Sequence, residues 1–269
     1  MFTKNYVYKP RLCTENVLRE RKLVLLVDLD QTLIHSSLCY NARMAVKGIQ
    51  QVRRKGTCIT FWLRLRPGTI KFLKNISSRY EMIVCTMGTA NYAKTVVQVL
   101  DPSQEIFKGR IISREYFGKS NVKSGILNQI FYNGDQSLIH MIDDRSSVWQ
   151  NNPSLIKVPC YKFFNSDGTV SPTAYLMDDD CYLEELEKHL KQIHKDFYSA
   201  CEEEPAFSSE AKRDNDNVID LERDIARMPN EEPEVSMFRR GWKWLSKMAQ
   251  AEKSVTLTGE GTYRKICYL

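Results

Sequence analysis

The sequence predicts an α/β fold with a central parallel sheet and flanking helices. Between residues 22 and 170 of the 269-residue chain, short apolar runs alternate with segments whose apolar residues recur at helical spacing. Three apolar runs end in polar residues, at positions 28–32, 86 and 143–144. Because chemistry in open parallel sheets gathers beyond the carboxyl ends of the strands, the same pattern predicts where a site lies.

The first half of this region contains two predicted strands and one helix. The apolar run at 22–28 has the composition of a buried strand, and a polar, basic stretch at about 38–56 follows it as a small insertion. Apolar residues then alternate over 57–66, which predicts a second strand. Pro67-Gly68 introduces a helix with an apolar face.

The second half continues the alternation. Apolar strands are predicted at 81–86 and 137–142, and helices at 90–100 and 126–131. Asp101-Pro102 ends the first of these helices, because the residue before a proline avoids helical geometry. A long helix at about 178–201 has an apolar stripe that favours packing over partner binding.

The chain is therefore expected to have four parts. Residues 1–21 form a polar lead-in, and residues 22–201 form the folded domain. Residues 202–236 are strongly acidic and contain three prolines, which predicts a disordered linker. Residues 237–269 form a basic, aromatic tail.

Net charge, cysteine spacing and the length of the apolar runs indicate which partners and which kinds of site to expect. A formal net charge of +6 suits an acidic substrate or partner, but the basic residues are scattered, so no direct contact with nucleic acid is expected. None of the eight cysteines forms a Cys-x-x-Cys pair, which argues against a zinc site and favours reduced thiols. No apolar run approaches membrane-spanning length, so we expect a soluble protein without membrane contact.

Two aspartates, Asp28 and Asp30, follow the first apolar run. Two like charges at the end of a buried strand are costly unless a cation compensates them. Mg²⁺, a hard cation that prefers oxygen ligands, satisfies this need. The alternative is an ordinary strand-to-turn junction, since Asp and Thr also cap turns.

Other strand ends supply the remaining groups for phosphoryl transfer. Thr86 can bind an anionic oxygen beside the start of a helix, and Asp144 can complete a Mg²⁺ shell with Asp28. Lys123 is the best-placed lysine to neutralise a phosphoryl group. Asp28 would then attack phosphorus, and Asp30 would protonate the leaving alkoxide and deprotonate the attacking water.

Five separated motifs follow one another along the chain. They are Leu-Leu-Val-Asp-Leu-Asp-Gln-Thr-Leu-Ile-His (25–35), Leu-Arg-Pro-Gly (65–68), Tyr92-Ala93 with Leu100-Asp101-Pro102, Arg-Ile-Ile-Ser-Arg (110–114) and Ile-Asp-Asp-Arg (142–145) with Trp149. In this order they resemble the haloacid dehalogenase superfamily, within it the FCP/SCP branch, and there the TFIIF-associating phosphatases of the RNA polymerase II C-terminal domain. Gln31 and Asp144-Arg145 separate the chain from the small C-terminal-domain phosphatases, which usually have Glu and Asn at these positions.

This resemblance implies a haloacid dehalogenase-like, Rossmann-like fold with a small cap and a catalytic phosphatase domain over residues 22–201. Mg²⁺ would be held by the carboxylates of Asp28 and Asp144 and the main-chain carbonyl of Asp30. Asp143 would orient Lys123 rather than bind metal. The residues expected to contact or support the phosphate are Thr32, Arg66, Thr86 and Lys123.

The resemblance also implies a substrate and a compartment. The substrate would be the phosphorylated C-terminal domain of RNA polymerase II, with general transcription factor TFIIF as a possible partner and the nucleus as the place of action. The 33 residues at 237–269 are too few for the BRCT-type domain that larger family members carry. Tethering by that domain is therefore not expected.

Several alternatives stay open at this point. The substrate could be another nuclear or cytoplasmic phosphoprotein, or the domain could be a non-catalytic binding module. Trp62 and Trp149 are interpreted as packing residues. The basic residues of the insertion either steer an acidic phosphopeptide or form a solvated loop; they are Arg43, Lys47, Arg53, Arg54 and Lys55.

Overall fold

The computed structural model describes residues 11–40, 47–54, 57–133, 136–175 and 180–203. The chain divides into two units, residues 1–194 and residues 195–269, and the sheet and the site described below belong to the first. The predicted acidic linker beyond residue 203 and the basic tail lie outside the described residues. The predicted lead-in contains a short helix, α1 (Thr14–Arg19), that buries Val17 and Leu18.

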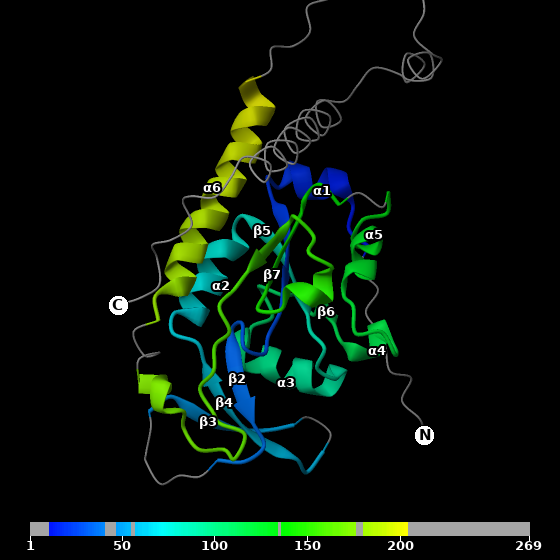
Figure 1. Cartoon of the computed structure of the whole chain (residues 1–269). Helices are drawn as coiled ribbons and strands as arrows, with labels where there is room; N and C mark the ends of the chain where they lie inside the picture. The colour runs from blue at the N-terminus through cyan, green and yellow to red at the C-terminus, as the bar shows by residue number, and fades with distance from the viewer. Residues whose placement is uncertain (1–10, 41–46, 55–56, 134–135, 176–179, 204–269) are drawn as a thin grey trace, which may run out of the picture. The chain divides into compact units, whose positions relative to one another are not determined.

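The core of the first unit is a five-stranded sheet in the order β6-β5-β1-β7-β8 (Figure 1). All four pairings are parallel, as the alternation of strands and helices predicted. The strands are β1 (Leu23–Val27), β5 (Tyr80–Cys85), β6 (Ile111–Ile112), β7 (Ile139–Asp143) and β8 (Leu155–Lys157).

The central strand β1 is apolar along its whole length because both faces of the sheet are covered. All five of its residues are buried, as are all five of β7. In the register of the sheet, Val27 lies opposite Val84 on one side and Ile142 on the other. The residues that follow these three positions therefore emerge at the same edge.

Three longer helices accompany the sheet, and α2 and α6 lie side by side (Figure 1). Lys71 of α2 donates to Glu184 of α6 at 3.0 Å, and Asn75 donates to Glu187 at 3.0 Å. The bounds are α2 (Thr69–Ser77), α3 (Ala90–Leu100), α4 (Arg114–Phe117), α5 (Leu127–Ile130) and α6 (Tyr182–Glu203), with 3₁₀ turns η1 (Ser124–Ile126), η2 (Ser146–Trp149) and η3 (Pro172–Tyr175).

Helix α2 begins after Gly68, whose φ of 78° lies in the left-handed region that glycine adopts without strain. The Pro-Gly pair predicted this start. The long C-terminal helix begins at Tyr182, later than the predicted residue 178, and residues 176–179 lie outside the described part.

The insertion and the segments on either side of it contain more structure than expected. Strands β2 (Ile34–Ser37), β3 (Ile49–Arg53) and β4 (Thr60–Leu65) form a separate antiparallel sheet in the order β2-β4-β3, here called the cap sheet. The strand predicted at 57–66 thus exists but stands outside the parallel sheet. β2 and β3 escaped prediction because their residues are mostly half-exposed and polar, which leaves a weak apolar pattern.

A small aromatic cluster covers the cap sheet. Tyr161, Phe163 and Phe164 are buried together, and Trp62 and Ile49 pack against them. Trp62 therefore serves packing, as predicted.

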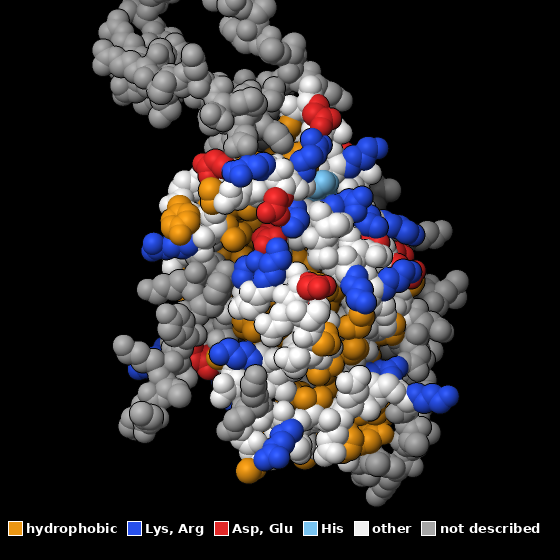
Figure 2. Space-filling model, turned by 180° about the vertical axis from the view of Figure 1, so that it is seen from behind, with side chains coloured by type: hydrophobic (Ala, Val, Ile, Leu, Met, Phe, Trp, Pro, Cys, Tyr) orange, Lys and Arg blue, Asp and Glu red, His pale blue; other side chains and the backbone are white. Residues whose placement is uncertain are grey.

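Charges of both signs are dispersed over the described part of one face. Figure 2 shows Lys and Arg side chains spread over one face, with Asp and Glu side chains among them. Every cysteine in the described part of the chain is free. No described helix has both the length and the apolar composition that crossing a membrane requires.

His140, a buried residue of β7, should make the domain sensitive to acid. Burial lowers its pKa to about 4, and its Nδ1 is buried without a hydrogen-bond partner. The unfolded chain binds a proton below about pH 6.5 and the folded chain only near pH 4, so stability is lost as pH falls through this window.

We expect the free energy of unfolding to fall by about 2 kcal/mol more in the parent than in His140→Gln between pH 7 and pH 5. Urea denaturation at the two pH values measures this difference. The exposed Lys188→Gln variant is the control and should behave like the parent. Equal acid sensitivity of the parent and His140→Gln contradicts the prediction.

Candidate active site

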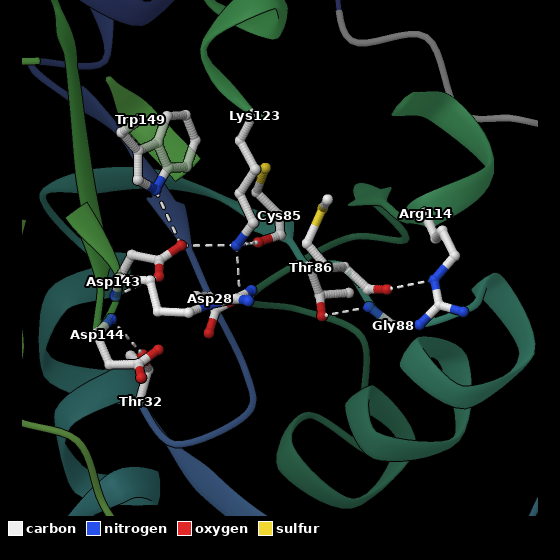
Figure 3. A network of polar contacts seen from close by, with 12 residues as sticks. Asp28, Thr32, Cys85, Thr86, Gly88, Arg114, Lys123, Asp143, Asp144 and Trp149 are labelled. Atoms are coloured by element: carbon white, nitrogen blue, oxygen red, sulfur yellow. Dashed lines mark hydrogen bonds and ion pairs between the residues drawn. The ribbon is translucent and has the colours of Figure 1, made fainter. Parts of the chain in front are cut away.

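Three neighbouring strands deliver the polar residues of the site to one edge of the sheet (Figure 3). Asp28 follows β1, Thr86 follows β5, and Asp143 ends β7. Because β5, β1 and β7 are neighbours in one parallel sheet, their carboxyl ends lie side by side. The parallel register then places these residues within reach of a common ligand.

Lys123 joins two of the carboxylates. Its Nζ donates to Asp28 Oδ1 at 2.6 Å and to Asp143 Oδ2 at 2.6 Å, and it also donates to the carbonyl of Cys85 at 2.9 Å. The lysine side chain has no exposed surface. Because all three of its hydrogens find acceptors, the buried ammonium is fully compensated.

Trp149 completes this cluster. Its Nε1 donates to Asp143 Oδ2 at 2.9 Å, and its ring lies 5.7 Å from the ammonium of Lys123. Trp149 is buried, which agrees with its interpretation as a packing residue. Its hydrogen bond also fixes the Asp143 carboxylate, which in turn holds Lys123.

Burial has the largest single effect on the pKa values of Asp28 and Lys123. It raises the pKa of Asp28 to about 7, although the charge of Lys123 partly offsets the effect. Burial alone disfavours the charged form of Lys123, but the Asp28 and Asp143 carboxylates raise the pKa of this lysine overall. At neutral pH the lysine is charged, and any further cation near Asp28 favours its carboxylate form.

The donor set suits a divalent metal ion. Asp28, Asp143 and Asp144 each offer a carboxylate oxygen, and these atoms lie within 4.8 Å of one another. Both oxygens of Asp143 already accept hydrogen bonds, from Lys123 and Trp149 on one and from the Arg145 amide at 2.9 Å on the other. Asp28 and Asp144 are therefore the better placed ligands, and hard oxygen donors fit Mg²⁺.

Asp30 has partners that sequence reasoning did not assign. The hydroxyl of Tyr92 donates to Asp30 Oδ1, and Ser36 Oγ donates to the same oxygen at 3.3 Å. Burial raises the pKa of Asp30, which helps to keep a carboxylic acid protonated. Tyr92 belongs to a motif that the sequence analysis recognised, whereas Ser36 comes from a strand that it missed.

A cavity of about 510 Å³ opens over these residues. Thr86 Oγ1 accepts from the Gly88 amide at 3.0 Å, which holds the loop before α3 against the cavity. The lining residues are Asp28, Asp30, Gln31, Ser36, Arg54, Thr86, Met87, Gly88, Thr89, Tyr92, Arg114, Asp144 and Arg145. Of the predicted site residues, Asp28, Asp30, Thr86 and Asp144 thus line one space, with Lys123 and Asp143 buried beneath Asp28.

Two predicted phosphate-binding residues, Thr32 and Arg66, do not line this cavity. Thr32 is fully buried, and its Oγ1 accepts from the Asp144 amide at 3.1 Å. Arg66 is 3% exposed, and its Nε donates to Asp180 Oδ2 at 2.7 Å. Its Nη1 donates to the Thr32 carbonyl at 3.2 Å. Both residues thus hold the loop that bears Asp28 and Asp30, which is the supporting role that the resemblance allowed beside a direct phosphate contact.

Comparison with known proteins places this site in a family. The family model "NLI interacting factor-like phosphatase" matches residues 23–199, which contain the whole described site. The chain belongs to this phosphatase family.

Relatives of this phosphatase domain carry a more specific name. The RNA polymerase II C-terminal domain phosphatase of Caenorhabditis elegans is 37% identical over 199 residues, which cover 68% of this chain and 29% of the relative. The human protein of the same name is 40% identical over 153 residues, which cover 57% and 16%. The chain thus spans less than a third of the length of these curated relatives.

Solved structures agree with the fold. Fcp1, described as an essential RNA polymerase II CTD phosphatase, matches with a TM-score of 0.59 and 31% identity over 70% of this chain and 67% of that one. A variant of the fission yeast CTD phosphatase Fcp1 bound to beryllium fluoride matches with a TM-score of 0.57 and 30% identity, over 69% and 66%. The haloacid dehalogenase-like fold implied by the sequence is confirmed.

The position of Arg66 gives a prediction that separates support from direct binding. In Arg66→Met, the partly buried Asp180 carboxylate loses its ion-pair partner and the Thr32 carbonyl loses a donor, so the free energy of unfolding should fall by about 2 kcal/mol. Urea denaturation measures the change, and the exposed Lys74→Met variant controls for loss of a positive charge. A variant of unchanged stability with a raised KM would instead place Arg66 on the phosphate.

Proposed function

We propose that this domain is a Mg²⁺-dependent protein-serine/threonine phosphatase that acts on the C-terminal domain of RNA polymerase II through an aspartyl-phosphate. The observation that carries the proposal is the buried Lys123, hydrogen-bonded to Asp28 at the floor of a cavity that Thr86 and Asp144 also border. A lysine held next to a strand-end carboxylate provides the charge that an incoming phosphoryl group needs.

Asp28 is the proposed nucleophile. Its free carboxylate oxygen would attack phosphorus, while Lys123 and the Thr86 hydroxyl stabilise the charge on the phosphoryl oxygens. Asp143 and Trp149 act on Lys123, since their contacts fix its position rather than reach the cavity.

Asp30 is the proposed general acid and base. Its carboxyl group borders the cavity, so it can protonate the alkoxide that leaves when Asp28 takes the phosphoryl group. The resulting carboxylate then removes a proton from the water that hydrolyses the aspartyl-phosphate. Tyr92 and Ser36 hold this carboxyl group in place through both steps.

The ligands of Mg²⁺ would be the carboxylates of Asp28 and Asp144 and the main-chain carbonyl of Asp30. When bound, Mg²⁺ would offset the repulsion between the Asp28 carboxylate and the phosphate. Asp144 is positioned for this by Thr32, which holds its amide.

The names of the relatives support a polymerase substrate, and a nuclear location would follow from it. Association with TFIIF is part of the same proposal. The cavity is open and bordered by the small cap sheet, so it can admit a polypeptide segment.

Heptad peptides phosphorylated at single serines test the substrate. Faster release of phosphate from one of them than from an unrelated phosphopeptide supports the polymerase assignment. Equal rates on all peptides would favour another phosphoprotein as substrate.

Asp28→Asn tests the reaction. Without the nucleophile, Mg²⁺-dependent hydrolysis of p-nitrophenyl phosphate should fall by about 10⁴-fold or more. The exposed Asp167→Asn variant, which makes the same chemical change away from the cavity, should retain activity. Substantial hydrolysis by Asp28→Asn would remove the proposed mechanism.

Tyr92→Phe tests the role of Asp30. The Tyr92 hydroxyl stabilises the Asp30 carboxylate, so its loss should raise the pKa of Asp30. Because Asp30 must be protonated to act as the acid, the high-pH limb of the kcat profile should move to higher pH. Tyr132→Phe, at an exposed position, is the control. An unmoved limb in Tyr92→Phe would contradict the assignment.

A further inference from the structure

One wall of the cavity carries cations that the proposed reaction does not use. Arg54 follows β3, and its Nη2 donates to Thr89 Oγ1 at 2.6 Å. Thr89 is the residue that precedes α3, so this contact joins the cap sheet to the core beside the site. Arg54 and Thr89 both line the cavity.

The guanidinium of Arg54 has a hydrogen-bond donor that no described acceptor satisfies. Its Nε is buried and has no hydrogen-bond partner, a condition shared by few side-chain atoms in the described residues. A guanidinium has five N–H donors, and a buried donor without an acceptor is costly. An acceptor brought by a ligand would relieve this cost, and a carboxylate or phosphate matches the geometry of the fork.

Arg54 stands apart from the groups that would hold the scissile phosphate. That phosphate would be bound at the strand ends by Lys123 and Thr86, next to Asp28. Arg54 instead contacts Thr89, the residue before α3, which is a different partner from the Asp28 and Asp143 carboxylates that hold Lys123.

A second cation lines the same cavity. The side chain of Arg114 is exposed, and its Nε donates to the Met87 carbonyl at 2.7 Å (Figure 3). Two arginines thus flank the Met87–Thr89 loop, one from the cap sheet and one from α4. A cavity of about 510 Å³ is larger than one phosphate needs and has room for flanking residues of a peptide.

We propose that Arg54 forms a subsite for a second anionic group of the substrate, a carboxylate or phosphate on a residue flanking the phosphoserine. This inference rests on the proposed phosphopeptide substrate and names one of its recognition features. The sequence analysis considered that the basic residues of the insertion attract an acidic phosphopeptide by their summed charge. The present proposal instead assigns recognition to a direct contact with Arg54.

Binding measurements test this without requiring hydrolysis. The full chain carrying Asp28→Asn is titrated with fluorescent phosphoserine peptides in the presence of Mg²⁺, and anisotropy gives Kd. Three peptide series carry Glu, a second phosphoserine or Gln at each position within about three residues of the phosphoserine, a span that an extended chain covers in about 10 Å. The Glu and phosphoserine arms distinguish the two sources of the anion.

We expect an anionic group at one position to lower Kd by about tenfold relative to Gln, as one charge-assisted hydrogen bond would. Adding Arg54→Met should abolish this ratio. The matched control is Arg53→Met, which removes the same charge from an exposed neighbour that does not line the cavity and should keep the ratio.

Two further variants distinguish a direct contact between Arg54 and the anion from a structural role of Arg54. Thr89→Val removes the acceptor that orients Arg54 and should reduce the ratio, while Arg54→Lys should restore only part of it because a lysine lacks the fork. Thermal melting verifies that each variant is folded.

The proposal is overturned if the parent binds Glu, phosphoserine and Gln peptides equally. It is also overturned if Arg53→Met and Arg54→Met reduce the ratio alike, which would indicate long-range steering. Because these readouts are affinities, a failure of the subsite is distinct from a failure of catalysis, which p-nitrophenyl phosphate hydrolysis by the parent reports.

Discussion

The buried ion cluster of Lys123 with Asp28 and Asp143 is the constraint on which the site depends. A fully buried ammonium is tolerated only where acceptors satisfy it, and here they come from β1, β5 and β7. The parallel register of these strands sets the acceptors at one level. The apolar sequence of β1 is therefore as necessary to the site as the carboxylate that follows it.

Most of the fold and much of the site could be predicted from local patterns. Strongly apolar strands such as β1 and β7 are visible in the sequence because both faces of a parallel sheet are buried. The polar residues that follow them, Asp28 and Asp144, were recognisable for the same reason, since a carboxylate after an apolar run is unusual. Lys123 was found through the charge that the chemistry requires.

The sequence was less informative where contacts join distant segments. The resemblance implied that Arg66 contacts or supports the phosphate, but the motif could not show that Arg66 pairs with Asp180, which lies 114 residues further along the chain. Ser36 lies in β2 and Arg54 directly follows β3, two polar strands whose patterns are weak. The sequence had placed Arg54 among the basic residues of the insertion and the resemblance had singled out Tyr92, but the contacts of Arg54 with Thr89 and of Tyr92 with Asp30 became visible only in three dimensions.

The central claim is that Asp28 becomes phosphorylated during turnover. It is tested most directly by quenching the full chain during hydrolysis of a phosphopeptide with sodium borohydride, which reduces an acyl phosphate to an alcohol. Peptide mass spectrometry then locates the reduced residue. The account predicts homoserine in place of Asp28, dependent on substrate and Mg²⁺. Reduction at another carboxylate during active turnover would contradict it.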